Sequence, residues 1–192
     1  FYMLYVPPPP FGDTLLSENL EAIRSLTAFN VVKGTGNGNF NPTGTATRSE
    51  MTAFICRAIP SAMTSGACVG NTWACEDWSS DPNTYFHDLY LADPELQRTI
   101  RTLKHYGIAN GYGDGYFGTL DPVLKAQVIS FITRALVYRG YWYHLQNWDP
   151  GVYANVGWSS GHRQDILTYY RYVGPIYGTE SNIWNWSDWT AN

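Results

Sequence analysis

Gly34-Thr35-Gly36-Asn37-Gly38-Asn39-Phe40 recurs 77 positions later as Gly111-Tyr112-Gly113-Asp114-Gly115-Tyr116-Phe117, with every glycine and the closing phenylalanine in place. Glycine adopts backbone angles that other residues resist, so this stretch predicts a tight turn. The same shift aligns residues 23–59 with 100–136 without a gap, and pairs identical residues such as Ile23 with Ile100. Chance would not preserve glycines and apolar positions together, so the chain contains a duplicated unit.

Each unit is predicted to fold as helix, glycine turn and helix. In the first unit, Leu20, Ile23 and Leu26 recur at helical spacing. After the turn, Thr47 and Glu50 have the spacing of a capping box, which marks the start of a second helix. The apolar face expected on that helix comprises Met51, Phe54, Ile55, Ala58 and Ile59.

A third, shorter copy is predicted from a shift of 144 positions. Gly178 then falls on Gly34 and Trp184 on Phe40, while Leu167 and Tyr170 take the places of Ile23 and Leu26. By this register the second helix would begin near position 191, and the chain ends at Asn192. We therefore expect the third unit to lack its second helix.

The composition argues against several classes of protein. Among 192 residues, 16% are aromatic and only 15% are charged, and the formal net charge is −4. Without a basic stripe to neutralise phosphates, nucleic acid is not an expected partner. No segment has the roughly 20 consecutive apolar residues of a transmembrane helix. The four histidines share no metal-ligand spacing with a carboxylate or cysteine, so neither a metal site nor a cofactor is expected.

The three cysteines are expected to differ in state. Cys68 and Cys75 bracket a short polar loop that a disulfide could close, and unpaired thiols are the alternative. Cys56 lies in a helical pattern and is expected to be a buried thiol outside any bridge. A local disulfide favours an oxidising compartment.

Three motifs, in the same order in both units, resemble the S-layer homology (SLH) family. The family pattern opens with Phe-x-Asp-Val, passes through a Gly-(Ile)-x-x-Gly-x-x-(Asp)-Gly-x-Phe segment and closes with Thr-Arg-Ala-Glu. The opening is similar to residues 11–14 (FGDT) and 86–89 (FHDL), and the closing motif to 47–50 (TRSE) and 124–127 (LKAQ). The resemblance covers most of residues 11–137, with a degenerate third copy at about 153–192.

The resemblance implies a mainly α fold in which three helix–turn–helix repeats surround a pseudo-threefold axis, the third being truncated. It also implies binding of acidic wall polysaccharide in grooves between repeats. Arg48 matches the arginine that meets the acidic group, and Lys125 takes its place in the second repeat. Gly34 and Gly111, at the start of the two glycine turns, complete the candidate polysaccharide site.

The expected organisation has five parts. An apolar and proline-rich arm (1–10) precedes the first repeat (11–59), a cysteine-containing insertion loop (60–85), the second repeat (86–140) and the truncated third repeat with its tryptophan-rich tail (141–192).

Two functions remain open, and neither is catalytic. In the favoured hypothesis the protein assembles with copies of itself into an extracellular filament, tube or lattice. Its apolar N-terminal residues would enter an exposed apolar seat in the unfinished third repeat of the next copy. The residues assigned to this contact are Phe1, Tyr2, Leu4, Val6, Leu167, Tyr170, Trp184, Trp186 and Trp189. The alternative is an anchor that binds wall polysaccharide at the cell surface, and a glycan hydrolase is a distant third.

Overall fold

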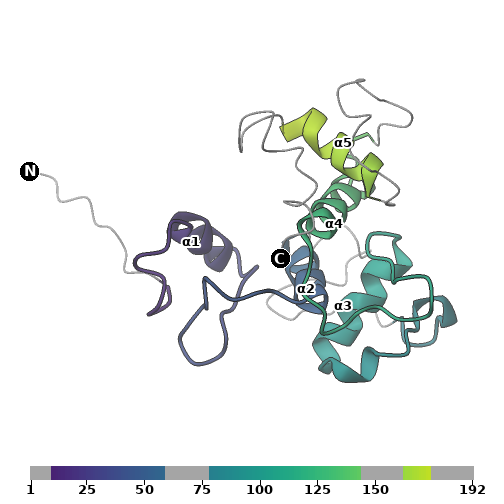
Figure 1. Cartoon of the computed structure of the whole chain (residues 1–192), viewed down its shortest axis with the longest axis horizontal. Helices are drawn as coiled ribbons and strands as arrows, with labels where there is room; N and C mark the ends of the chain where they lie inside the picture. Colours follow the sequence, from purple (N-terminus) through teal and green to yellow (C-terminus); the bar gives the residue numbers. More distant parts are fainter. Residues whose placement is uncertain (1–9, 59–77, 144–161, 174–192) are drawn as a thin grey trace, which may run out of the picture. The chain divides into compact units, whose positions relative to one another are not determined.

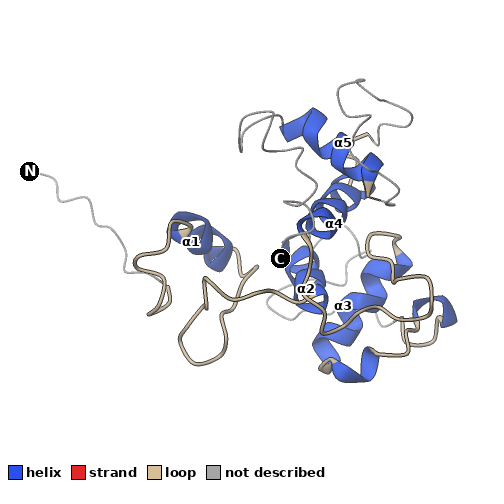
Figure 2. Ribbon diagram, in the orientation of Figure 1, coloured by secondary structure: helices blue, strands red, loops and turns tan. Residues whose placement is uncertain are grey.

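The computed structural model describes residues 10–58, 78–143 and 162–173 (Figure 1). This part of the chain is mainly helical, with no strand, as Figure 2 shows. The α-helices are α1 (Leu20–Ala28), α2 (Arg48–Ala58), α3 (Pro94–His105), α4 (Lys125–Tyr138) and α5 (Arg163–Val173), and two short 3-10 turns are η1 (Pro82–Thr84) and η2 (Leu89–Leu91). The mainly α class predicted from the sequence is confirmed, whereas the threefold arrangement and the third repeat stay predictions. None of the described helices is long and apolar enough to cross a membrane.

The chain divides into two compact units, residues 1–44 and 45–192. In the first unit, α1 buries Ile23, and the glycine turn that follows it folds back on the Phe11 ring. The rings of Phe11 and Phe40 lie 5.5 Å apart, and Phe40 is half-buried. Leu26, expected on the buried stripe, is 40% exposed.

The second unit is organised around α3. This helix packs against α2, while α4 packs against both α2 and α5. Pro94 begins α3 directly after Asp93, whose carboxylate accepts a hydrogen bond from the Leu96 N–H at 2.9 Å and caps the helix. The core members that are completely buried include Ile100, Leu103, Ile108, Ala109 and Phe117.

Helix α2 begins as predicted but buries a different face. The Thr47 N–H donates to Glu50 at 2.8 Å and the Glu50 N–H donates to the Thr47 hydroxyl at 3.2 Å, so the capping box is confirmed. The buried face carries polar side chains beside apolar ones, namely Arg48, Ser49, Thr52, Ala53, Ile55 and Cys56. Ala58 is exposed and Met51 and Phe54 are half-buried, so the predicted apolar face was wrong in part. Polar residues are tolerated there because they have partners: the Thr52 hydroxyl, for example, lies 2.8 Å from that of Thr99.

The same kind of ion pair joins α2 to α3 and α4 to α5. Arg57 donates to Glu95 at 2.7 Å, near the start of α3. Arg134, 77 positions after Arg57, donates to Asp165 at 2.7 Å, near the start of α5. In each case a carboxylate in the first turn of one helix, where the helix dipole favours negative charge, meets an arginine from the C-terminal half of the preceding α-helix.

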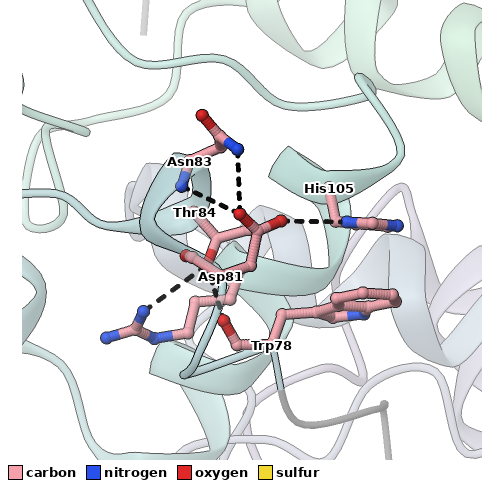
Figure 3. A network of polar contacts seen from close by, with 6 residues as sticks. Trp78, Asp81, Asn83, Thr84 and His105 are labelled. Carbon is pink, nitrogen blue, oxygen red and sulfur yellow. Dashed lines mark hydrogen bonds and ion pairs between the residues drawn. The ribbon is translucent and has the colours of Figure 1, made fainter.

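Figure 3 shows how residues 78–84 attach to the end of α3. Asp81 accepts from the Asn83 N–H at 2.9 Å and lies 3.2 Å from His105 Nδ1. The ring of Trp78 stacks on that of His105, with centroids 3.3 Å apart. The two contacts, one at a ring nitrogen and one on the ring face of His105, hold the segment before η1 against α3.

Several sequence predictions have a structural outcome here. Cys56 is buried, and its thiol donates to the Thr99 carbonyl at 4.0 Å. Leu167 is completely buried, which overturns the expectation that it lies in an exposed apolar seat. Cys68 and Cys75, Phe1, Tyr2, Leu4 and Val6, Trp184, Trp186 and Trp189, and the side chain of Tyr170 lie outside the described residues.

Candidate functional site

In the second repeat, the ring of Phe86 and the carboxylate of Asp88 both support the glycine turn. A Cβ added at Gly111 would lie 2.5 Å from the Phe86 ring, so only glycine fits there. Both oxygens of Asp88 accept backbone N–H groups just after the turn, from Phe117 and Gly118 at 2.8 Å each and from Thr119 at 2.7 Å. Burial alone would raise the pKa of Asp88, but these hydrogen bonds outweigh it and hold the pKa below its usual value.

The first repeat builds its turn in the same way. A Cβ at Gly34 would meet the Phe11 ring at 2.5 Å, and Asp13 accepts the Phe40 and Asn41 N–H groups at 2.8 and 2.7 Å. These hydrogen bonds, the one from Phe40 above all, lower the pKa of Asp13. The Phe-x-Asp opening of each repeat is therefore the support of its own glycine turn.

Arg48 reaches from the start of α2 into the turn of the second repeat. Its Nε donates to the Phe117 carbonyl at 2.8 Å and its Nη2 to the Asn110 carbonyl at 3.0 Å. The guanidinium carbon lies 4.7 Å from the centroids of both the Tyr112 and the Phe117 rings. Arg48 is only 2% exposed, so it is a buried support of the turn and not the surface residue that its place at a helix start suggests. Burial lowers the pKa of Arg48, but a guanidinium remains charged at any physiological pH.

One edge of this arginine faces a pocket of about 300 Å³, here called the Arg48 pocket. Nη1 of Arg48 makes no hydrogen bond to the described residues and is the group left to meet a ligand. The pocket lining is Arg48, Asn110, Gly111, Tyr112, Gln127, Phe131, Arg134 and His162. Two guanidinium groups, two side-chain amides, an imidazole and two aromatic rings thus line this space, which suits a small acidic group.

The far side of the Arg48 pocket is set by α5. Asp165, buried, holds Arg134 by hydrogen bonds of 2.9 Å from Nε and 2.7 Å from Nη2. His162 precedes α5, and its Nδ1 lies 2.7 Å from the Ser130 hydroxyl. Burial and the nearby charge of Arg134 lower the pKa of His162, so the imidazole is neutral at pH 7. The pocket therefore has two permanent cations and one group that can become a third in acid.

The structure brings two of the four predicted polysaccharide residues, Arg48 and Gly111, to one pocket. Lys125 begins α4, is exposed and does not line it. The second repeat also has only half of a capping box. Gln127 accepts a hydrogen bond from the Leu124 N–H at 3.1 Å, but Leu124 has no side-chain oxygen that could accept one from the Gln127 N–H. Gly34 lies in the first unit. The role of Lys125 and Gly34 in binding remains a prediction.

Sequence reasoning missed Arg134, His162 and Tyr112 as lining residues. Arg134 could have been found, because it repeats Arg57 at the shift of 77. Tyr112 replaces Thr35 of the first turn, a change that places an aromatic ring where only one of the two repeats has it. For His162 the sequence carries no signal, since its partner Ser130 is 32 positions away.

Comparison with protein families agrees with this geometry. A model of the S-layer homology domain matches residues 10–52 and 85–129. The chain contains two S-layer homology domains. Each matched segment begins one residue before the phenylalanine that supports the glycine turn, Phe11 or Phe86. No curated protein is significantly similar to the chain. The resemblance inferred from the motifs is confirmed.

S-layer homology domains are non-catalytic cell-surface modules that bind wall polysaccharide, so the SLH regions associate this chain with the cell surface. Within the described residues, no group of histidine, cysteine and carboxylate side chains could hold a metal ion.

Proposed function

We propose that the chain binds an acidic substituent of wall polysaccharide in the Arg48 pocket and so attaches to the cell surface. The observation that carries this proposal is the convergence of Arg48 and Arg134 on one partly enclosed space with hydrogen-bonding neighbours. Asp165 neutralises part of the charge of Arg134, whereas the charge of Arg48 is met by carbonyl oxygens and aromatic rings. The buried Arg48 guanidinium makes no direct contact with an anion among the described residues. A carboxylate that enters the pocket beside Nη1 would make that contact.

This site favours anchoring over the assembly function that the sequence alone favoured. An acidic group binds by charge-assisted hydrogen bonds, which are worth about 1.5–3 kcal/mol each when little water competes. Arg48 is already oriented by two backbone carbonyls, so it loses little side-chain freedom on binding. Because Arg48 is preorganised, a pocket of moderate size can bind an acidic group with little loss of side-chain entropy.

The test compares Arg48→Lys with Lys125→Ala for binding to purified wall sacculi and, by calorimetry, to glucuronic acid. Lysine keeps the positive charge but loses the planar set of donors that contacts both the turn and the ligand. We expect Arg48→Lys to weaken binding by about 2 kcal/mol and Lys125→Ala to leave it nearly unchanged. Circular dichroism of each variant separates a lost ligand contact from a lost turn. Binding that is equal for folded Arg48→Lys and the parent would contradict the proposal.

Self-assembly is a second candidate, supported by apolar residues of the first unit. Leu16 is 97% exposed and Phe29 is 77% exposed. Tyr106, the counterpart of Phe29 in the second repeat, is instead half-buried against the core. An apolar surface of this kind suits contact with another protein surface, and a second copy of the chain is the partner that the sequence suggests.

A further inference from the structure

A second cavity, of about 450 Å³, lies beside the glycine turn of the second repeat. Three tyrosines give it aromatic walls: Tyr90 is 78% exposed, Tyr112 50% and Tyr116 49%. Its size is within the range of small-ligand sites, and exposed aromatic walls with a few polar groups are the usual lining of such sites. We call it the tyrosine pocket. None of its residues belongs to the first unit.

Tyr112 is shared by the two pockets. The Arg48 guanidinium lies 4.7 Å from its ring centroid, and Tyr112 also lines the tyrosine pocket. Its hydroxyl donates to Asp121 Oδ2 at 2.8 Å, which fixes the ring between the two spaces. A ligand in the Arg48 pocket that continues past Tyr112 would therefore meet the tyrosine pocket next.

The polar groups of the tyrosine pocket have the opposite charge to those of the Arg48 pocket. Asp114 and Asp121 are exposed there, and neither forms an ion pair within the described part of the chain. Asp114 Oδ1 accepts from the Tyr116 N–H at 3.0 Å, and the second oxygen of each carboxylate is left to accept from a ligand. Asp88 also lines the pocket, but both its oxygens are taken by backbone N–H groups. Carboxylates so placed attract hydroxyl or amino donors and repel an acidic sugar.

We propose that the tyrosine pocket is a second subsite for the same polysaccharide and takes a sugar unit without an acidic group. The apolar C–H face of that sugar packs on Tyr90 and Tyr116, and its hydroxyl or amino groups donate to Asp114 and Asp121. This inference rests on the proposed function and adds to it one property of the ligand: the unit next to the acidic one is neutral or carries an amino group. A polymer with an acid on every unit places a carboxylate against Asp114 and Asp121.

The experiment measures binding of the full chain to three probes by calorimetry at one ionic strength. The probes are glucuronic acid, a hyaluronan tetrasaccharide, in which glucuronic acid alternates with N-acetylglucosamine, and an oligogalacturonate of equal length, in which every unit is acidic. We expect the alternating tetrasaccharide to bind about tenfold tighter than glucuronic acid, the gain that one aromatic contact with its hydrogen bonds can supply. Oligogalacturonate should show no such gain.

Variants then assign the gain to the tyrosine pocket. Tyr90→Ala and Asp114→Asn should each remove most of the gain while leaving glucuronic acid binding unchanged. Tyr143→Ala is the matched control, because Tyr143 is 80% exposed and does not line the pocket. If Tyr90→Ala fails to fold, Asp114→Asn still tests the proposal, since asparagine keeps an acceptor for the Tyr116 N–H.

Each outcome decides between the two proposals. If glucuronic acid binds and the gain is absent, survives Tyr90→Ala and Asp114→Asn, or appears equally with oligogalacturonate, the second subsite is wrong and the Arg48 pocket stands. If neither glucuronic acid nor the tetrasaccharide binds, both are wrong.

Discussion

Gly111 is the residue whose replacement most directly tests how the turn is built. A methyl group at Gly111 would meet the Phe86 ring at 2.5 Å, and that ring is fixed in the core. Gly113→Ala is the control, since Gly113 has a positive φ of 91° but open space around its Cβ position. We expect Gly111→Ala to lower the free energy of unfolding by about 3 kcal/mol and Gly113→Ala by about 1–2 kcal/mol. Urea denaturation of both variants measures the difference, and equal losses would show that the Phe86 ring moves aside and that lack of space does not select glycine at 111.

Asp88 makes the stability of the second glycine turn depend on pH. Its pKa is lowered in the folded chain, so the unfolded chain binds a proton more readily as pH falls. The stabilisation that its carboxylate provides is therefore complete above the usual aspartate pKa of about 4 and is lost as pH falls through the lower, folded value. Asp88→Asn should cost about 1.5–3 kcal/mol at pH 7 and flatten this part of the acid transition. Chemical denaturation between pH 2 and 7 checks both effects, and an unchanged acid transition in the variant would assign it to other carboxylates.

For single residues, the sequence predicted which positions form the turns and the site better than it predicted how buried their side chains are. The repeat register identified Gly34 and Gly111, and the resemblance to the SLH closing motif identified Arg48, because spacing and motif order are visible in the linear sequence. It did not predict that Arg48 is 2% exposed, since that burial depends on carbonyl groups of Asn110 and Phe117, more than 60 positions away. A charged residue at a helix start is normally exposed, and its burial needs partners that no local pattern records.

Two arginine–carboxylate ion pairs each join two helices, and the carboxylates of the two pairs differ in burial. The effect of removing each carboxylate can therefore be compared directly. Asp165 is 4% exposed and its partner Arg134 22%, whereas Glu95 is 39% exposed and its partner Arg57 9%. The two pairs therefore differ mainly in the burial of the carboxylate, and water competes for Glu95 but not for Asp165. We expect Asp165→Asn to cost about 2–3 kcal/mol and Glu95→Gln less than about 1 kcal/mol. Thermal denaturation of the two variants tests this order, and the reverse order would show that solvent does not set the difference.

Helix α5 should also make the chain sensitive to mild acid through His162. Because its pKa is lowered in the folded state, the unfolded chain takes up this proton first as pH falls below about 6.5. The stability that depends on a neutral His162 is thus complete above that pH and declines below it. His162→Gln should remove the decline between pH 6.5 and 5 in thermal melts. Glucuronic acid should bind the parent more tightly at pH 5.5 than at pH 7.5, since protonated His162 adds a cation to the Arg48 pocket, and the variant should show no such change.

Elements were predicted where their signals are local. The capping box at Thr47 and Glu50 located the start of α2, apolar spacing located α1, and the repeat shift of 77 positions located α3 and α4. The buried face of α2 was misjudged because Thr52 and Ser49 are satisfied by partners and pack like apolar residues of similar size. Leu167 was expected at an exposed seat, and α5 instead buries it while packing on α4. That error came from assuming that a helix without its repeat partner has no other helix to cover it.

For the whole molecule, most of the sequence-based prediction of the fold came from the duplicated unit. Two SLH domains follow from motif order alone, and the family match confirms them. The Arg48 pocket could not be derived, because its residues come from four separate parts of the chain: the start of α2, the second glycine turn, α4 and the residue before α5. The choice between anchoring and assembly likewise depends on surfaces rather than on motifs.

Anchoring and assembly can be separated by two changes that act on different parts of the chain. If the Arg48 pocket binds the wall, Arg48→Lys should reduce cosedimentation with sacculi, in line with a loss of about 2 kcal/mol of binding free energy, but leave the oligomeric state unchanged. If residues 1–6 mediate assembly, as six consecutive apolar or aromatic residues ahead of four prolines suggest, their deletion should do the reverse. Each large side chain of this segment contributes roughly 1.5–3 kcal/mol when it leaves water, so losing several should dissociate a polymer completely. Sedimentation velocity without polysaccharide reports assembly, and pull-down with sacculi reports anchoring. A truncated chain that still forms the same polymers would exclude residues 1–6 from the contact and leave the exposed Leu16 and Phe29 of the first unit as the surface to test next.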